Sequence, residues 1–255
     1  GQVRGLVTMC GNPALSLPNG GGRLTKAMSE LEFMVSFDIY VNETTRHADV
    51  ILPSPGHLYH SDFMIFFTFL TVRDYMRWCA PVFEPPAGTW QDADIINALV
   101  ARLEGITPQQ ADDRALRMLY DQLRAQGNPV VARHGFEHVV QSLGDERGQD
   151  RMFELLVRSG PYGDHFGERP DGLTLAVLKA SPHGVDFGPM QPRIADVIHH
   201  ADGMIDFAPD VITTDVARLE QWLRATPRNG LHLLGRRQVR TYNTWMHNFP
   251  ALAKG

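Results

Sequence analysis

The sequence predicts an α/β protein built on a parallel sheet, and three observations carry that prediction. The first hundred residues alternate short, continuously apolar runs with helical patterns, which is typical of parallel strands covered on both faces. Loops that contain glycine, proline or polar residues follow each apolar run, where the strands of such a sheet end and ligands bind. The composition is that of an ordinary globular chain, with 255 residues, 43% hydrophobic and 21% charged residues, and a net charge of -5.

The elements of the sheet can be assigned in order along the chain. The expected strands, each a short apolar run, are Gly5–Met9, Phe33–Phe37 and Asp49–Leu52. Between the first two, apolar residues recur at spacings of three and four, which predicts an amphipathic helix over Arg23–Leu31. The loop before that helix is rich in Pro and Gly, so we expect no regular structure in it. Thr44–Ala48 is expected to form at most one helical turn.

The remainder of the chain has the periodicity of helices. The expected helices are Gln91–Leu103, Pro108–Gln126, Gly135–Leu143, Gln149–Arg158 and Val211–Arg224, with stops at Gly105, Gly127 and Gly144. The segment Tyr162–Pro209 is rich in Gly, Pro and His, so we expect it to be largely irregular, and Leu231–Leu234 opens a new strand. The expected fold is therefore a Rossmann-like three-layer domain, based on a parallel sheet, with a helical insertion or extension.

Composition also narrows the classes of function. The acid excess offers no basic surface for a phosphate backbone, so we expect no nucleic-acid partner. The longest apolar run, Phe63–Val72, is about half the length that spans a bilayer, so no transmembrane segment is expected. Cys10 and Cys79 form no C-x-x-C pair and no disulfide framework, which favours the cytoplasm without fixing the compartment.

Motifs for catalysis or metal binding are not found. The sequence contains no nucleophile elbow, Walker loop, G-x-G-x-x-G fingerprint or H-E-x-x-H motif. His57, His60 and Asp62 have the residue types of metal ligands, but they lack a distant fourth partner. We therefore expect neither a catalytic residue nor a metal ligand in this chain.

The loops after the first two strands hold the candidate binding residues. Gly20–Gly22 come before a helix whose first amides face outward and would form an anion site, the alternative being a glycine-rich surface turn. Asp38 follows the second strand, where it either accepts two hydrogen bonds from a planar donor edge such as that of guanine or caps residues 39–42. Thr44 and Thr45 either cap the next turn or bind a ribose or phosphate, and Asp49 would orient a loop.

Two ordered stretches together resemble one protein family. GLVTMCGNPALSLPN, followed by LEFMVSFDIYVNETTRHADVILP, resembles the third domain of the molybdopterin guanine dinucleotide oxidoreductases, which include dimethyl sulfoxide reductase, formate dehydrogenases and nitrate reductases. The positions that match this motif are Gly11, Asn12, Pro13, Asp38, Glu43, Thr44, Ala48, Asp49 and Pro53. The final stretch, LHLLGRRQVRTYNTWMHNFPAL, resembles the opening of the family's fourth domain, which caps the cofactor. Its matching positions are Arg236, Arg237, Asn243, Trp245, His247 and Asn248.

The resemblance covers about the first 60 and the last 25 residues closely. Thr45 stands where many relatives have Ala. After Pro53, where many relatives have a glutamate, this chain has His57, His60 and Asp62, which departs from the family's pattern.

The resemblance implies which part of the cofactor each region binds. Residues 1–90 would hold one guanosine diphosphate arm of a bis-molybdopterin guanine dinucleotide cofactor that carries molybdenum or tungsten. In this arrangement Asp38 reads the base, and the loop of Gly11, Asn12 and Pro13 with Thr44 holds ribose and phosphate. Residues 91–228 would complete or elaborate the domain. Residues 229–255 would begin a truncated capping domain that contacts the pterin through Arg237, Asn243, Trp245, His247 and Asn248.

The resemblance also implies that this chain is a piece of a longer oxidoreductase. The iron–sulfur domain and the metal-ligating residue of the relatives would precede Gly1, so we expect no turnover from this chain alone. The implied partners are the pterin cofactor, the missing domains of the parent and an electron-transfer subunit, while the substrate stays open. The alternative is a non-catalytic α/β interaction module that has lost its cofactor site and binds a partner through residues 91–158.

Overall fold

The computed structural model describes residues 2–63, 70–198, 200–225, 230–231, 234–235 and 249–253. The chain divides into two compact units, Gly1–Pro189 and Met190–Gly255, and each is described here by itself. The predicted boundaries near residues 90 and 228 stay predictions. The predicted pterin contacts all lie outside the described residues: Arg236, Arg237, Asn243, Trp245, His247 and Asn248. The middle of the predicted strand at 231–234 lies outside them as well.

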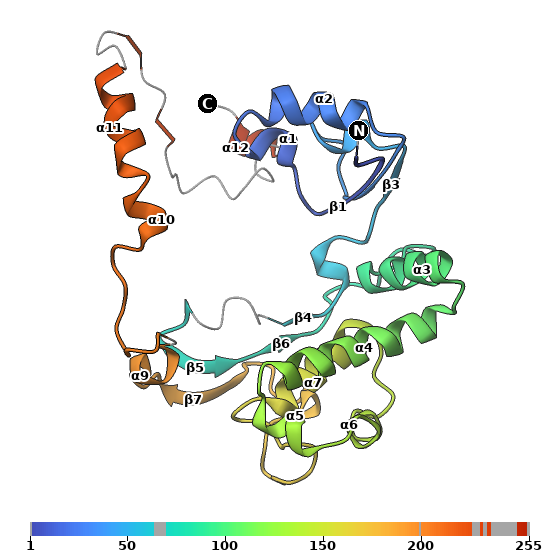
Figure 1. The fold of residues 1–255 in the computed structure, drawn as a ribbon. Coiled ribbons are helices and arrows are strands. Elements are labelled where there is room, and N and C mark those ends of the chain that lie inside the picture. The colour runs from blue at the N-terminus through green and yellow to red at the C-terminus, as the bar shows by residue number, and fades with distance from the viewer. Residues whose placement is uncertain are drawn as a thin grey trace. The chain divides into compact units, whose positions relative to one another are not determined.

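A parallel three-stranded sheet opens the first unit and confirms the predicted α/β class (Figure 1). Its strands are β1 (Gly5–Met9), β2 (Phe33–Phe37) and β3 (Val50–Leu52), in that spatial order. The register pairs Met9 with Phe37 and Phe37 with Leu52, so all three strands end at one edge. The loops that follow β1 and β2 therefore lie next to each other at that edge.

The loop after β1 contains more regular structure than expected. Pro13–Ser16 forms a one-turn helix, α1, because proline at the first helical position is already fixed at a helical φ. A π-helical turn, η1 (Gly20–Leu24), leads directly into α2 (Thr25–Ser29). The helix predicted over Arg23–Leu31 thus begins at Gly20 and ends earlier, and the prediction of an irregular loop was wrong for these residues.

Helices cover both faces of the sheet, which gives the three expected layers. On one face Met34 packs with Ala14 of α1 and Met28 of α2. On the other face Val35 and Phe37 pack against Ile95 of α3 (Asp92–Glu104). Adjacent residues of β2 point to opposite faces, so the same five-residue strand supplies both contacts.

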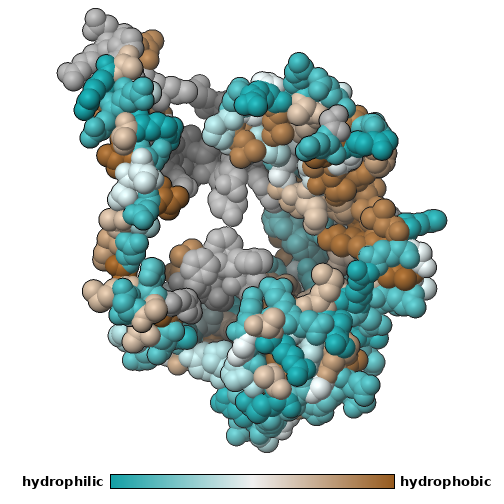
Figure 2. Space-filling view, in the orientation of Figure 1, coloured by the Kyte–Doolittle hydropathy of each residue, from teal (hydrophilic) through white to brown (hydrophobic). Residues whose placement is uncertain are grey.

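The edge strand β1 keeps part of its apolar surface exposed. Val7 and Met9 pair with Val35 and Phe37 and share their face, yet 56% and 52% of their surface remain exposed. Figure 2 shows hydrophobic residues gathered in the region of the three strands. The helix that packs on Val35 and Phe37 therefore covers the centre of this face and leaves its β1 side open.

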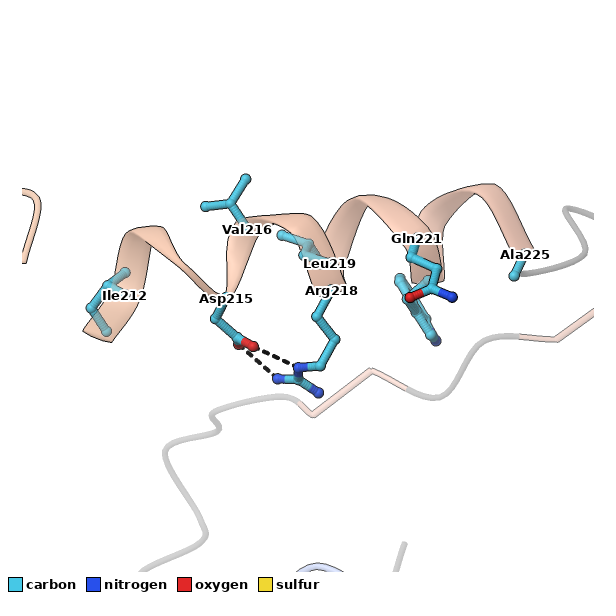
Figure 3. A pocket seen from close by; sticks show the side chains of 8 residues that line it. Ile212, Asp215, Val216, Arg218, Leu219, Gln221 and Ala225 are labelled. Atoms are coloured by element: carbon cyan, nitrogen blue, oxygen red, sulfur yellow. Dashed lines mark hydrogen bonds and ion pairs between the residues drawn. The ribbon is translucent and has the colours of Figure 1, made fainter. Parts of the chain in front are cut away.

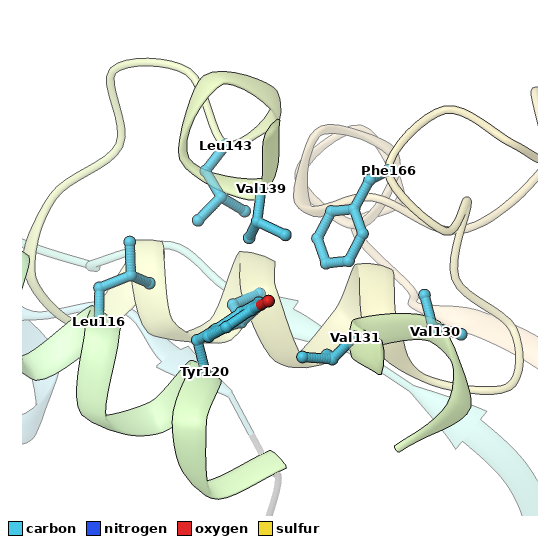
Figure 4. Packing of buried hydrophobic residues seen from close by; sticks show 8 residues of the cluster. Leu116, Tyr120, Val130, Val131, Val139, Leu143 and Phe166 are labelled. Carbon is cyan, nitrogen blue, oxygen red and sulfur yellow. The ribbon is translucent and has the colours of Figure 1, made fainter. Parts of the chain in front are cut away.

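The rest of the first unit is mainly helical, as predicted. Its helices are α3 (Asp92–Glu104), α4 (Pro108–Ala125), α5 (Pro129–Arg133), α6 (Phe136–Ser142), α7 (Gly148–Ser159) and α8 (Leu175–Lys179). Residues Gly105, Gly127 and Gly144 follow three of these helices at positive φ, which confirms the predicted stops. A buried cluster joins α4 to α7 with Phe166, and Figure 4 shows Tyr120 at its centre.

The first unit also contains short helical turns and two-stranded ladders. The 3-10 turns η2 (Thr45–His47) and η3 (His57–Tyr59) flank β3, and η2 confirms the helical turn expected there. Two antiparallel ladders pair β4 (Asp62–Phe63) with β6 (Trp78–Cys79) and β5 (Arg73–Met76) with β7 (Val185–Pro189). Among the described residues of 162–209, regular structure is confined to α8, β7 and the four-residue helix α9 (Ile194–Val197), so the prediction that this segment is largely irregular is confirmed.

A buried arginine ties the helices of the first unit together. Arg151 of α7 is 2% exposed, and its Nη1 binds Asp112 Oδ2 at 2.9 Å and Asp113 Oδ1 at 2.5 Å. Asp112 also accepts the Gly148 amide at the start of α7. Since a buried charge is tolerated only when it is paired, this contact fixes how α4 and α7 meet.

The second unit is described at four short helices. They are α9 (Ile194–Val197), α10 (Asp210–Thr213), α11 (Val216–Ala225) and α12 (Pro250–Ala253). The helix predicted over Val211–Arg224 is split between α10 and α11. Figure 3 shows a shallow groove along these two helices, where Ile212, Val216 and Leu219 lie beside an ion pair of Asp215 with Arg218.

No helix in the described part of the chain is both long and apolar enough to cross a membrane.

Neighbouring aspartates give a matched test of the buried ion pair. Replacing Asp112 by Ala leaves the Gly148 amide without this acceptor and leaves the buried guanidinium with only the exposed Asp113, so we expect a loss of about 3–5 kcal/mol in unfolding free energy. Replacing Asp113, whose side chain is 60% exposed, should cost no more than about 1 kcal/mol. Urea unfolding of both variants measures the difference, and equal losses would contradict this account.

Glu154 predicts a pH dependence of stability. It is buried, accepts the Leu175 amide at 2.5 Å, and burial raises its pKa above the ordinary value of a glutamate. The folded protein therefore holds this proton more tightly than the unfolded chain, and the associated stability is lost as the pH rises. The unfolding free energy of the wild type minus that of Glu154→Gln should fall as the pH rises from about 4 to about 7. A difference that stays constant or increases would contradict the prediction.

Candidate functional site

A buried hydrogen-bond network joins the loops after β1 and β2. Thr44 Oγ1 donates to Asn12 Oδ1 at 2.8 Å and accepts the Ala14 amide at 3.0 Å. Asn12 Nδ2 donates to Glu43 Oε2 at 2.7 Å. Thr44 is fully buried and Asn12 is 8% exposed, so both side chains serve to hold the two loops side by side.

The loop after β2 is closed by its own polar side chains. Asp38 Oδ1 accepts the Tyr40 amide at 2.9 Å, and Asp38 Oδ2 accepts Asn42 Nδ2 at 2.9 Å. Asn42 Oδ1 accepts the amides of Thr44 and Thr45, each at 3.0 Å. Asp38 thus caps the turn over residues 39–42, which confirms one of its two expected roles, and its role toward a base stays a prediction.

Asp38 nevertheless retains acceptor capacity. An ionised carboxylate has about four lone-pair sites, and two hydrogen bonds from the protein reach this one. The side chain is half-buried at the carboxyl end of β2. This is the position in which a parallel sheet presents a group to a ligand.

Asp92 joins this edge of the sheet and is not part of the predicted site. Partial desolvation raises the pKa of the Cys10 thiol, and the negative charges of Asp92 and Asp38 raise it further. The charges of both carboxylates therefore act on the same thiol, which is exposed just after the end of β1. Asp92 Oδ1 is buried and has no hydrogen-bond partner in the described part of the chain. Only the packing of α3 on Val35 and Phe37 reveals this residue, because nothing in its local sequence marks it.

The glycines of the first loop do not form the expected anion site. Gly20–Gly22 do not precede a helix but make its first turn, η1. The Gly20 amide donates to Leu17 O at 2.9 Å and the Gly22 amide to Asn19 O at 3.2 Å. Two of the three amides are therefore already used within the loop, and their availability for an anion was overestimated.

Asp49 does not lie with the other predicted residues. Its Oδ2 accepts the Met34 amide at 2.7 Å, near the start of β2. Asp38 follows the end of the same strand, four residues further on, which corresponds to roughly 13 Å. Asp49 thus completes the hydrogen bonding of β2 at the opposite edge of the sheet.

The remaining predicted positions lie just after β1. Gly11 and Pro13 are half-buried there, Pro13 as the first residue of α1, and their role toward a ligand stays a prediction. No group of three or more metal-ligating side chains that could hold a metal ion occurs within the described residues, which include His57, His60 and Asp62.

Two adjacent glycines give a matched test of this loop. A Cβ on Gly20 would lie 2.4 Å from Pro13 O and 2.6 Å from Ala14 O, whereas one on Gly21 would meet only Ala14 O at 3.9 Å. We expect Gly20→Ala to lower the unfolding free energy by about 1–3 kcal/mol through overpacking, and Gly21→Ala to change it by less than about 1 kcal/mol. Thermal unfolding measures both, and a harmless Gly20→Ala would show that α1 does not pack against η1 in this way.

Comparison with known proteins finds that a short stretch of this chain is similar to part of one enzyme subunit. No family model matches the chain, and no solved structure matches it significantly. A stretch of 58 residues is 45% identical to the assimilatory nitrate reductase catalytic subunit of Bacillus subtilis (strain 168). This stretch covers 23% of the chain and 8% of that protein. Part of the chain is therefore related to the catalytic subunit of an oxidoreductase.

Proposed function

We propose that the chain is part of a molybdopterin guanine dinucleotide oxidoreductase and that its parallel sheet holds one guanosine diphosphate arm of the cofactor. The observation that carries the proposal is Asp38, a half-buried carboxylate at the carboxyl end of β2 that keeps acceptor capacity. The local similarity to a nitrate reductase catalytic subunit supports the same assignment.

The carboxylate of Asp38 fits the donor edge of guanine. Guanine presents N1–H and an exocyclic amino group side by side, and both need acceptors. Asp38 accepts two hydrogen bonds from the protein and has lone pairs left for the two donors of the base.

The loop after β1 fits the anionic part of the arm through its backbone. The amides of Gly11 and Asn12 donate to no acceptor in the described part of the chain. Asn12 and Thr44 would act through the loop rather than by direct contact, because their side chains are buried and bonded to each other. Pro13 starts α1 and fixes where the loop turns.

The remaining roles follow from the family resemblance. Arg237, Asn243, Trp245, His247 and Asn248 would contact the pterin from the start of a capping domain. When bound, the metal that the pterins hold supplies the redox chemistry, and this chain contributes binding and orientation. An iron–sulfur cluster and an electron-transfer partner would belong to the parent enzyme.

Nucleotide-dependent stabilisation tests the proposal. Guanosine diphosphate at 100 times its dissociation constant should raise the melting temperature by about 5–10 °C, and adenosine diphosphate should have little effect. Asp38→Ala should abolish the shift, because it removes the carboxylate that would accept the two donors of guanine.

Asp49→Asn is the matched control, because Asp49 binds a strand amide at the opposite edge of the sheet. It should lower the melting temperature without removing the response to guanosine diphosphate. Equal stabilisation by both nucleotides would contradict the proposal. No response to either would favour the alternative of an interaction module without a cofactor site.

A further inference from the structure

We infer that Asn42 is the positioning residue for base recognition, because it fixes the carboxylate of Asp38 in the orientation that two parallel donors require. The inference rests on the proposed function and adds to it a residue that is not among the matching positions of the family motif. Its side chain is the one that joins the end of β2 to the turn before β3.

The Asn42 side chain is held from both of its ends. Its Oδ1 accepts the amides of Thr44 and Thr45, and its Nδ2 is thereby turned toward Asp38 Oδ2 at 2.9 Å. Its backbone amide donates to Thr45 Oγ1 at 2.8 Å, and that hydroxyl donates to Tyr40 O at 2.9 Å. Thr45 is 1% exposed, so these contacts exclude water and leave the amide group little freedom to rotate.

The hydrogen bond from Asn42 to Asp38 Oδ2 matters for the selectivity between bases. Asp38 Oδ1 is held by the Tyr40 amide and Oδ2 by Asn42, so the plane of the carboxylate is set before a ligand arrives. Bidentate acceptance requires both oxygens to face the two donors together. A carboxylate free to rotate would still accept one hydrogen bond but would discriminate poorly between bases that differ in the second donor.

The substitution Asn42→Asp isolates this role. The new carboxylate can still accept the Thr44 and Thr45 amides, so the turn keeps its caps, but the donor to Asp38 is lost. Two carboxylates in contact share a proton when the pH falls, and a protonated carboxyl group can again donate to Asp38. The other titratable groups of the surrounding elements are Cys10, Glu43, His47 and Asp92. These groups are present in both the wild type and Asn42→Asp, so their effects on the pH dependence cancel when the two proteins are compared.

Calorimetric binding of guanosine and inosine diphosphates to the full chain provides the readout, because inosine lacks the exocyclic amino group. The wild type should prefer guanosine diphosphate by at least about tenfold, the effect of one hydrogen bond to a charged group. In Asn42→Asp at about pH 8 this preference should fall below about threefold, and at about pH 5.5 it should return. The wild-type preference should stay constant over the same range.

Thr45→Val controls for a merely structural effect. It removes the hydroxyl that binds the Asn42 backbone amide. The Asn42 side chain keeps its contacts with Asp38 and with the backbone amides of residues 44 and 45, so the variant should have a lower melting temperature but the same preference for guanosine diphosphate. The inference is overturned if Asn42→Asp keeps the wild-type preference at about pH 8, or if Thr45→Val loses it to the same extent.

A second measurement separates this inference from the proposed function. The Asn42 side-chain amide protons should shift in the NMR spectrum of Asp38→Ala, with or without nucleotide. If the wild type binds no guanosine diphosphate but this shift occurs, the proposed function fails while the Asn42–Asp38 contact stands. If the shift is absent, the positioning role is contradicted whether or not the nucleotide binds.

Discussion

The hydrogen bond from Thr44 to Asn12 is the contact on which the candidate site depends. It connects two loops that leave adjacent parallel strands, and it is fully enclosed, so neither partner can exchange it for water. Because Thr44 also accepts the Ala14 amide, the same hydroxyl fixes the start of α1. The position of Asp38 relative to the loop after β1 then follows from the register of β1 and β2 together with this one contact.

The helix α3 connects the parallel sheet of the first unit with the helices that follow it in the chain. Its apolar side packs on Val35 and Phe37, and its first residue, Asp92, reaches the edge where Asp38 and Cys10 lie. Further along the chain α4 and α7 are joined by the buried Arg151, which has carboxylates on its Nη1 and no partner for its Nε within the described residues. The helices that follow the sheet are therefore packed on it through α3, which covers Val35 and Phe37.

The sequence predicts most of the strands and helices that depend on a local pattern of apolar residues. The three strands have continuous apolar runs, and the long helices have clear periodicity, so their limits were placed to within one or two residues. The helix at Pro13–Ser16, the turn at Gly20–Leu24 and the ladder of β5 with β7 were missed, because each is short and stabilised by contacts with distant residues. The candidate site divides in the same way. Asp38 can be found because it directly follows an apolar strand. The surroundings of Asn42 and Asp92 depend on packing that no local sequence pattern encodes. Asp49 was predicted as part of the site, although it accepts a backbone amide at the opposite edge of the sheet.

The most direct test of the account is a crystal structure of the full chain with guanosine diphosphate. The account predicts that the N1 and N2 atoms of guanine lie about 2.7–3.2 Å from the carboxylate of Asp38, with Asn42 Nδ2 still bonded to that carboxylate and the phosphates against the loop after β1. A nucleotide bound elsewhere, or a base that turns a different edge toward Asp38, would contradict it.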